Sequence, residues 1–547
     1  MTARPAPPSK SSGLQRRHFL AASALPLIGC AKPDDIQGGF TGVHHERGHL
    51  LKDRTAWPAP SITRKTRVLI LGGGVAGLAA ARALRLKGQD DFALLELEDV
   101  AGGNSRGGSV NGITCPLGAH YLPVPGDDAH EVQDLLEELG LRQRVAGRWQ
   151  YDERHLCHSP QERLFLNGAW QDGLLPMQGV GPETLAQYQK FSQLIEQERQ
   201  AAHWTIPTSK LPLTQVLLAR SAITFIAYLN QHGLTDPHLR WYLNYCCRDD
   251  FGAGMATVSA WAGIHYFASR HGFHAPGAES AEREGVLTWP DGNGWLTQRL
   301  AAPLKERLHT GRVVLRVASV KHGVEVDAFN TATQTVERWQ ARRVIVALPI
   351  FVAARVVQNA PDFLRQAAAR TVYAPWLVAN IHLHTPLHDR PGAAPSWDNV
   401  LYGAPGLGYV DAMHQSLKPV PGATVLTYYG ALGDVPGGPN AGRRLLIDKP
   451  WGAWRDDILA ELALAHPDLP AKTSRIDITR YGHAMAVPVP VPKILSQIGL
   501  QPMNYMRKKL SKKEQSTRTH EQLTFAHSDW AGYSVFEEAF TLGHHAG

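Results

Sequence analysis

Three glycines at a fixed spacing are the first residues in this chain whose types could do chemistry. Gly72, Gly74 and Gly77 fit the pattern Gly-x-Gly-x-x-Gly, with Val75 and Ala76 between the last two. In such a pattern the first glycine makes a tight turn, the second admits a pyrophosphate, and the third lets a helix pack on a strand. Backbone amides at the start of that helix then meet the phosphate charge. The spacing therefore predicts a dinucleotide site.

The segments around these glycines have the patterns of the elements that must position them. Residues 67–71 (RVLIL) are typical of a buried parallel strand, and residues 78–84 (LAAARAL) favour a helix. A second apolar run, 92–95, is followed by Glu96, about 20 residues after the glycine motif. In this type of site a carboxylate at that distance accepts hydrogen bonds from ribose hydroxyls. That carboxylate would repel the extra phosphate of NADP, so the sequence argues against NADP as the dinucleotide.

Two adjacent acids near the middle of the chain lie among aromatic residues. The segment 241–252 (WYLNYCCRDDFG) contains Asp249 and Asp250, and another aromatic segment, 261–267, follows it. Acids beside aromatic rings suit a cationic amine, because both the carboxylate charge and the ring quadrupole attract it. The second interpretation is a core helix that ends in these acids, with Arg248 as their ion-pair partner. The sequence leaves both interpretations open.

Motifs on both sides of this segment resemble those of the flavin-containing amine oxidoreductases, a family that includes protoporphyrinogen oxidases and carotenoid desaturases. They are a second glycine pair at Gly102 and Gly103, a segment with Gly118, Ala119 and His120, a strand at 343–349, and a closing motif at 525–543 with Asp529 and Tyr533. The resemblance touches roughly residues 66–547 and is strongest at both ends. It implies that the dinucleotide is FAD.

The resemblance also implies roles for individual cofactor-binding residues. Asn104 stands where the family usually has an arginine after the second glycine pair, and Arg106 is the candidate substitute for the phosphate contact. The backbone near Val317 would reach the adenine. Asp529 would bind the ribityl or pyrophosphate portion of FAD.

The candidate catalytic residues are Asn380, Tyr533 and Asp250. Many amine oxidases of the family carry a lysine that holds a water near flavin N5, and the matching segment here offers Asn380. Both an oxidase that reacts with oxygen and a dehydrogenase that uses another acceptor therefore stay open. The resemblance implies hydride transfer from an amine to the flavin. The alternatives are an FAD-dependent desaturase or dehydrogenase acting on an apolar substrate, and a non-catalytic membrane-tethered flavoprotein.

These motifs predict an α/β fold with two domains. A Rossmann-like FAD-binding domain is expected to assemble from the separated segments 66–125, 285–375 and 475–547. Residues 126–284 and 376–474 lack cofactor motifs and are expected to form an α+β substrate domain.

The N-terminal residues predict export. Residues 1–29 contain the adjacent Arg16 and Arg17 followed by a short apolar run, which resembles the twin-arginine signal of bacterial proteins exported in folded form. A segment like a lipobox ends at Cys30, so we expect Cys30 to be acylated and residues 30–65 to form a tether. The protein is therefore expected in the periplasm as a lipoprotein, at the inner or the outer membrane. No run of 18 apolar residues predicts a transmembrane helix.

The composition excludes several other functions. The chain has 547 residues, with 56 lysines and arginines against 49 acids, a formal charge of +7. Four of the basic residues lie in 1–29, so the exported chain would be close to neutral, which gives little support to nucleic-acid binding. Five cysteines without a CxxC pair predict neither a disulfide framework nor a zinc site, and we expect no metal.

Overall fold

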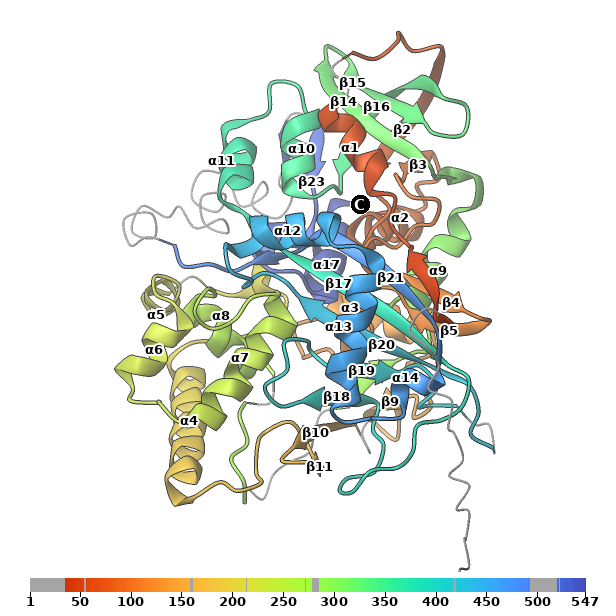
Figure 1. Ribbon diagram of the computed structural model, residues 1–547. Coiled ribbons are helices and arrows are strands. Elements are labelled where there is room, and N and C mark those ends of the chain that lie inside the picture. The colour runs from red at the N-terminus through yellow and green to blue at the C-terminus, as the bar shows by residue number, and fades with distance from the viewer. Residues whose placement is uncertain are drawn as a thin grey trace, which may run out of the picture.

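Two large sheets and a group of helices build this protein (Figure 1). The computed structural model describes residues 35–53, 56–157, 161–212, 214–270, 272–277, 285–416, 420–491, 519–520 and 522–547. The first sheet is largely parallel and the second is mixed, and helices cover both. This architecture confirms the predicted fold class, a Rossmann-like unit assembled from separated segments together with an α+β unit.

The first sheet follows the order β13-β3-β2-β16-β15-β14, and β23 pairs with β16. Its central strands are parallel because helices or long excursions connect them, whereas β14 and β15 form an antiparallel hairpin. The strands are β2 (Ile62–Leu71), β3 (Phe92–Leu95), β13 (Leu308–His309), β14 (Arg312–Val320), β15 (Gly323–Asn330), β16 (Thr335–Val346), β22 (Thr519–His520) and β23 (Leu523–Phe525).

Alternate residues of the first sheet pack into two different cores, as the period of two in a strand requires. Ile70 and Leu94 belong to one core, and Leu69 and Leu95 belong to the other. The helices that supply the first core are α2 (Val75–Leu86), α3 (His130–Glu138), α9 (Gly294–Ala301) and α17 (Phe536–Ala546), and those that supply the second are α10 (Ile350–Val356) and α11 (Asp362–Arg370).

The second sheet follows the order β1-β21-β17-β20-β19-β18-β10-β11. Three helices pack on one of its faces, through Leu377, Ala379 and Ile381 of the central strand β17. The strands are β1 (Gln37–Phe40), β10 (Glu162–Leu166), β11 (Ala169–Asp172), β17 (Val372–Leu383), β18 (Asp398–Leu401), β19 (Tyr409–Asp411), β20 (Thr424–Ala431) and β21 (Thr473–Val487), and the helices are α12 (Gly438–Asp448), α13 (Trp451–Ala463) and α14 (Leu469–Lys472).

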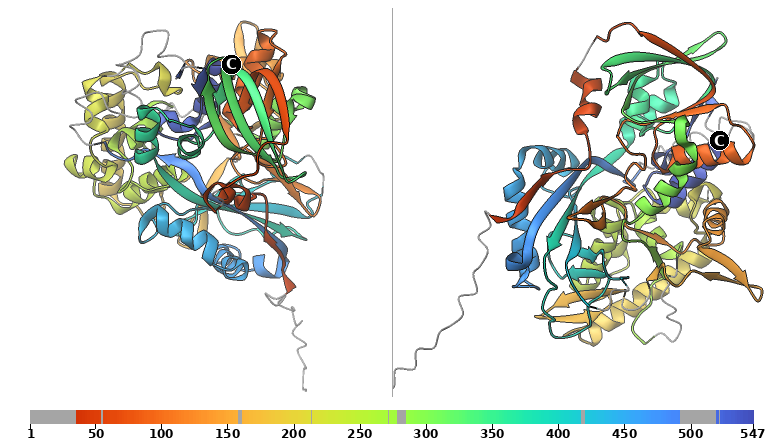
Figure 2. Two further views of the ribbon diagram at one scale, coloured as in Figure 1. Left: turned by 90° about the horizontal axis from the view of Figure 1, so that it is seen from above. Right: turned by 90° about the vertical axis from the view of Figure 1, so that its right-hand side faces the viewer.

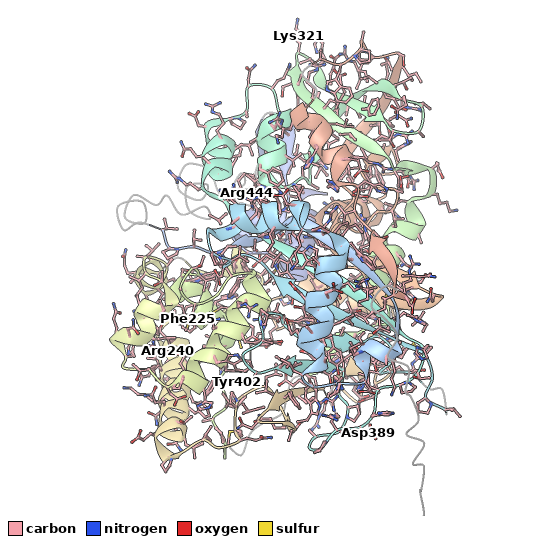
Figure 3. The ribbon with its side chains drawn as sticks, viewed as in Figure 1. Phe225, Arg240, Lys321, Asp389, Tyr402 and Arg444 are labelled. Carbon is pink, nitrogen blue, oxygen red and sulfur yellow. The ribbon has the colours of Figure 1, made fainter. Side chains whose placement is uncertain are left out.

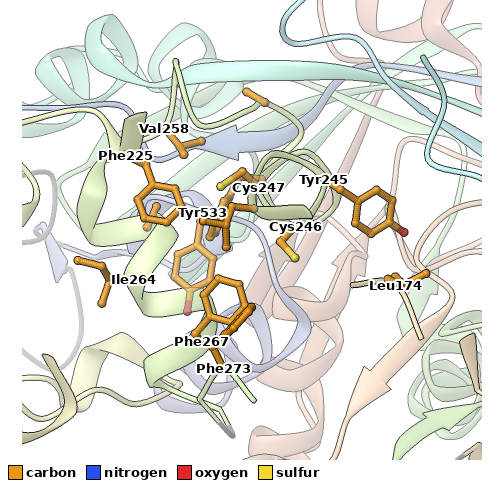
Figure 4. Close-up of a cluster of buried hydrophobic side chains, with 14 of the residues drawn as sticks. Leu174, Phe225, Tyr245, Cys246, Cys247, Val258, Ile264, Phe267, Phe273 and Tyr533 are labelled. Carbon is orange, nitrogen blue, oxygen red and sulfur yellow. The ribbon is translucent and has the colours of Figure 1, made fainter. Parts of the chain in front are cut away.

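The other face of the second sheet meets a helical region, through Trp376 and Val378 of β17. In Figure 3 this region, marked by Phe225 and Arg240, lies far from Lys321 at the tip of the β14–β15 hairpin. Cys246 and Cys247 are packed in its core beside aromatic rings (Figure 4). The helices are α4 (Pro182–Ala201), α5 (Gln215–Arg220), α6 (Phe225–Gln231), α7 (Pro237–Phe251) and α8 (Ala260–Ala268).

Short elements connect these layers. They are β4 (Gly107–Val110), β5 (Ile113–Pro116), β6 (Tyr121–Pro123), β7 (Arg142–Val145), β8 (Arg148–Tyr151), β9 (Leu156–Cys157), β12 (Val286–Thr288) and the 3-10 helices η2 (Thr208–Lys210), η3 (Ala302–Arg307) and η4 (Ser528–Ala531).

Two boundaries of the predicted domains differ from the packing. Residues 475–487 were assigned to the cofactor domain, but they belong to β21 (Thr473–Val487), which pairs along its length with β17 of the second sheet. Helix α3 was assigned to the substrate domain, but its Val132, Leu135 and Leu136 pack in the core of the first sheet. In both cases the apolar face of the element determines which layer it joins.

Part of the expected tether is folded. Within residues 30–65, β1 pairs in parallel with β21, and helix α1 (His45–Asp53) follows (Figure 2). Cys30 and the signal-like residues 1–29 lie outside the described residues. None of the helices in the described part of the chain combines the length and apolarity needed to cross a bilayer.

Candidate active site

A cavity of about 440 Å³ lies where the two sheets meet. Its wall includes residues that follow the carboxyl ends of β2 and β3, and residues of β17, β20 and β21. Such a position, outside the carboxyl ends of parallel strands, is where open α/β sheets bind ligands. Thirteen predicted site residues line it: Gly72, Gly74, Val75, Ala76, Glu96, Gly102, Gly103, Asn104, Gly118, Ala119, His120, Asp250 and Asp529.

The glycine motif forms a cradle at the start of α2. A Cβ on Gly77 would lie 1.8 Å from the carbonyl oxygen of Gly72, so only glycine lets the helix approach the strand this closely. A Cβ on Gly74 would meet no atom nearer than 3.9 Å and would occupy open cavity. Helix α2 has no side-chain cap and no acid in its first turn, so its free amides suit a phosphate. This geometry fits a dinucleotide.

Glu96 is fixed by backbone donors on the same side of the cavity. The amide of Gly73 donates to its Oε2 at 2.6 Å, and the amide of Glu98 donates to its Oε1 at 2.8 Å. Burial raises the pKa of Glu96, and these two amides oppose that effect. The carboxylate is therefore oriented before any ligand arrives.

The carboxylate of Asp529, also in the cavity wall, is held by several polar partners. The hydroxyl of Tyr373 donates to its Oδ2 at 2.6 Å, the amide of Ile350 donates to the same atom at 3.0 Å, and His527 lies 3.1 Å from Oδ1. Burial opposes ionisation, but these partners outweigh it and hold the pKa of Asp529 below its usual range. The group is a fixed negative charge at the cavity.

Two predicted cofactor contacts lie elsewhere. Arg106 does not line the cavity, because its guanidinium turns away to donate to the carbonyl of Gly42 and lies 3.5 Å from Glu98. Val317 is fully buried in the core of the β14–β15 hairpin, and Val313 and Val314 line the cavity in its place. The pairing of β14 and β15 is irregular between Val314 and Arg316.

Two candidate catalytic residues are also absent from the cavity wall. Asn380 is fully buried in β17, where its Oδ1 accepts a hydrogen bond from Thr427 at 2.8 Å. Tyr533 is packed in the core of the helical region and donates to Glu538 at 3.0 Å. The residues of β17 that line the cavity are Tyr373, Trp376 and Val378, all nearer the start of the strand than Asn380. No lysine is among the described residues of the wall.

Aromatic side chains form the wall beside the Gly118–His120 segment. Tyr429 of β20 donates to the carbonyl of Gly118 at 3.0 Å, and Tyr481 of β21 donates to the carbonyl of Leu117 at 2.7 Å. The ring of His120 stacks on Tyr429 with centroids 4.3 Å apart. Burial lowers the pKa of His120 to about 3, so its imidazole is neutral. The second sheet thus holds the cofactor-domain segment in place.

A group of acids lies on the same wall. Asp249, Asp250, Arg270 and Glu537 all line the cavity. Arg270 lies 3.1 Å from Oδ1 of Asp250, and Oδ2 of Asp250 has no hydrogen-bond partner among the described residues. Burial, with the charge of Asp250, raises the pKa of Asp249 to about 7. Burial likewise raises the pKa of Glu537 to about 7.

Sequence analysis found only part of this acidic group. It named Asp249 and Asp250, and one of its two interpretations paired both with Arg248, whose guanidinium instead donates to the carbonyl of Pro405. Glu537 was missed, although it stands in the first turn of the helix that follows the closing motif. Arg270 has no motif of its own, and only the packing of α7 against α8 brings it to Asp250.

The sequence matches a known family over most of these elements. The model of the family described as flavin containing amine oxidoreductase matches residues 75–434. An L-amino acid dehydrogenase of Synechocystis sp. is 24% identical over 305 residues, which cover 54% of this chain and 58% of that protein. The matches to the curated relatives span between 12% and 58% of those proteins' lengths.

Solved structures show the same fold. Wild-type putrescine oxidase bound to putrescine superposes with a TM-score of 0.63 at 16% identity, covering 88% of this chain and 98% of that one. Cyclohexylamine oxidase from Brevibacterium oxydans superposes with a TM-score of 0.60 at 17% identity, with the same coverage. Together with the glycine cradle and the family match, this shows that the chain belongs to the flavin-containing amine oxidoreductase family, whose cofactor is FAD.

Proposed function

We propose that the protein oxidises the C–N bond of a cationic amine. The observation that carries this proposal is the part of the cavity wall that combines aromatic side chains with Asp249, Asp250 and Glu537, with Arg270 as the neighbouring cation. FAD, when bound, accepts a hydride from the carbon next to nitrogen. The amine nitrogen loses a proton, and water hydrolyses the resulting imine to a carbonyl compound and a free amine.

The charges of this wall favour a cation. Arg270 is matched by Asp250, so within the described part of the chain Asp249 and Glu537 have no basic partner of their own at hydrogen-bond distance. Each has a pKa of about 7 because burial disfavours its ionised form. An ammonium group bound between them would stabilise the ionised forms. The same carboxylates can take the proton that the ammonium must lose before hydride transfer.

Apolar and aromatic side chains of the second sheet exclude water from the reacting bond. Trp376, Val378 and Tyr429 are buried side chains of the second sheet that face the cavity. A dry, aromatic environment strengthens the attraction between a carboxylate and an ammonium group.

An anaerobic titration tests the proposal. The purified, FAD-loaded protein is mixed with monoamines, polyamines and amino acids, and bleaching of the flavin absorbance is followed. We expect a cationic amine to bleach the flavin, and the variant Asp249→Asn to need a higher amine concentration. Reduction by dithionite is the control. If dithionite reduces the flavin and no amine does, the proposal is wrong, and an apolar desaturation substrate or an electron-transfer role becomes the next hypothesis.

We also propose that electrons leave to an acceptor other than oxygen. The described wall of the cavity contains no lysine, the residue that holds a water near flavin N5 in many amine oxidases of the family. Air is readmitted after the titration, and the return of the oxidised spectrum is timed. Slow reoxidation supports a dehydrogenase, whereas reoxidation faster than steady-state turnover would identify an oxidase.

For its location, we propose a periplasmic lipoprotein. The support is the pattern of Arg16, Arg17 and Cys30 in the sequence. Acylation at Cys30 would hold the protein at a membrane, since several acyl chains anchor where one does so only marginally. Labelling with a radioactive fatty acid, with Cys30→Ser as the unlabelled control, tests the anchor.

A further inference from the structure

The N-terminal segment 36–53, here called the strap, contacts both sheets. Its first part, β1, adds a parallel strand beside β21, from Gln37 opposite Arg475 to Phe40 opposite Ile478. The contact is close: Gly38 has φ +139°, and a Cβ there would lie 1.9 Å from the carbonyl oxygen of Ile476. The strap is therefore built into the second sheet by backbone pairing.

The next residues of the strap dock on the first sheet. The amide and the Nδ1 atom of His44 lie 3.0 and 2.7 Å from the carboxylate of Glu98. Arg47 donates to both carboxylate oxygens of Asp99, at 2.8 and 3.1 Å, and to the carbonyl of Leu97 at 3.0 Å. Leu97, Glu98 and Asp99 directly follow Glu96, the acid predicted to bind ribose.

Arg106 takes part in the same contact. It was predicted to bind a phosphate, but it donates to the strap's Gly42 carbonyl and pairs with Glu98. Glu98 thus lies between Arg106 and His44, with only 9% of its side chain exposed. A buried carboxylate with two basic neighbours fixes the position of the strap more firmly than the exposed Arg47–Asp99 pair does.

Helix α1 then brings Leu51 into the wall of the cavity. Leu51 lines the cavity together with Leu97, Val313 and Val314, beside Glu96. From the opposite side, Arg355 of α10 donates to the carbonyl of Leu51 at 2.8 Å. Figure 1 shows α1 beside α10 and the β14–β15 hairpin. The strap consequently closes the end of the cavity where Glu96 lies.

We propose that the strap is part of the FAD site, with Leu51 covering the adenosine half of the cofactor and slowing its release. FAD can contact Leu51 only while α1 is docked. Because such coupling is reciprocal, bound FAD should in turn hold α1 in place. The inference depends on FAD binding and not on the amine substrate. A holoenzyme that no amine reduces would therefore overturn the proposed function and leave this inference standing.

The test measures release of FAD from the holoenzyme by the recovery of flavin fluorescence after dilution. We expect Leu51→Ala to release FAD about tenfold faster, because that loss of apolar contact corresponds to about one decade in affinity. Leu51→Met, which keeps the volume, should behave like the unmodified protein. Lys52→Ala, at the exposed neighbouring position of the same helix, is the matched control.

Hydrogen exchange of the unmodified protein gives a second readout that needs no variant. The amides of residues 47–53 should exchange more slowly with FAD bound than in the apoprotein. The inference is wrong if Leu51→Ala releases FAD at the rate of Lys52→Ala, or if exchange in α1 is the same with and without FAD.

Discussion

At the scale of single residues, buried acids near the substrate should make amine binding depend on pH. Asp249 and Glu537 both have pKa values raised to about 7 by burial, so they are largely protonated at pH 6 and largely ionised at pH 8. Alkylamines stay protonated across this range. The attraction for a cation is thus present above pH 7 and lost below it.

We therefore expect the KM for a cationic amine to fall as pH rises from 6 to 8. Asp249→Asn should raise KM about tenfold at pH 8 and change it little at pH 6, because the acid carries charge only at the higher pH. The measurement is KM against pH for both proteins. Asp90→Asn is the control, because Asp90 is an exposed acid that does not line the cavity. Parallel pH profiles for Asp249→Asn and the unmodified protein would contradict the assignment.

Asp529 behaves oppositely, because its partners hold its pKa below the usual range. Its contribution to stability is present above its unfolded pKa near 4 and is lost only as pH falls through its lower folded pKa. We expect Asp529→Asn to lower the free energy of unfolding by about 2 kcal/mol at pH 7, since hydrogen bonds to a charged group are lost. Tyr373→Phe, which removes one of these donors, should cost about half as much. Urea titrations at pH 7 measure both, and a larger loss for Tyr373→Phe would contradict this order.

At the scale of elements, the contact between α2 and β2 positions the cofactor cradle. Gly77→Ala would place a Cβ 1.8 Å from the carbonyl oxygen of Gly72, so the helix must move away from the strand. We expect a loss of about 3 kcal/mol in unfolding free energy, together with weaker FAD binding. Gly126→Ala is the control, because a Cβ there meets no atom within 4 Å. Equal stability and FAD content of the two variants would show that the close approach is not required.

The elements also show how far the sequence could be interpreted. Gly72, Gly77, Glu96 and Asp529 could be placed because each belongs to a local pattern with a fixed offset from a strand or helix. The strap could not, because HERGHLLKD has no apolar periodicity and buries only a few side chains against partners about 50 residues away or more. The preceding Gly38 and Gly42 look like linker residues, yet they allow close backbone contacts with β21.

The same limit explains why some predicted site residues do not line the cavity. Asn380 and Val378 lie on one face of β17, and only the position of the cavity along the strand decides which residue reaches it. Arg270 meets Asp250 through the packing of two helices, which no local pattern encodes. Tertiary contacts of this kind determine which residues face the substrate more than they determine which residues face the cofactor.

At the scale of the whole molecule, the cavity is enclosed by segments from distant parts of the chain. Leu51, Glu96, Tyr373 and Asp529 come from four of them, and Tyr481 ties the second sheet to the Gly118 segment. A cavity assembled in this way exists only after the chain has folded. We therefore expect FAD to be loaded in the compartment where the chain folds, which under the proposed twin-arginine export is the cytoplasm.

The proposed export in folded form is compatible with this order of events, and it gives the last prediction. Replacing the adjacent Arg16 and Arg17 with lysine should leave the protein in the cytoplasm, folded and carrying FAD, because the signal acts after the cofactor is bound. Cell fractionation with flavin fluorescence measures location and FAD content together. Cys30→Ser is the matched control: this variant should reach the periplasm carrying FAD but should not attach to the membrane. If the lysine variant accumulates as apoprotein while the Cys30→Ser protein is loaded, FAD must enter after export, and the coupling of loading to cytoplasmic folding is wrong.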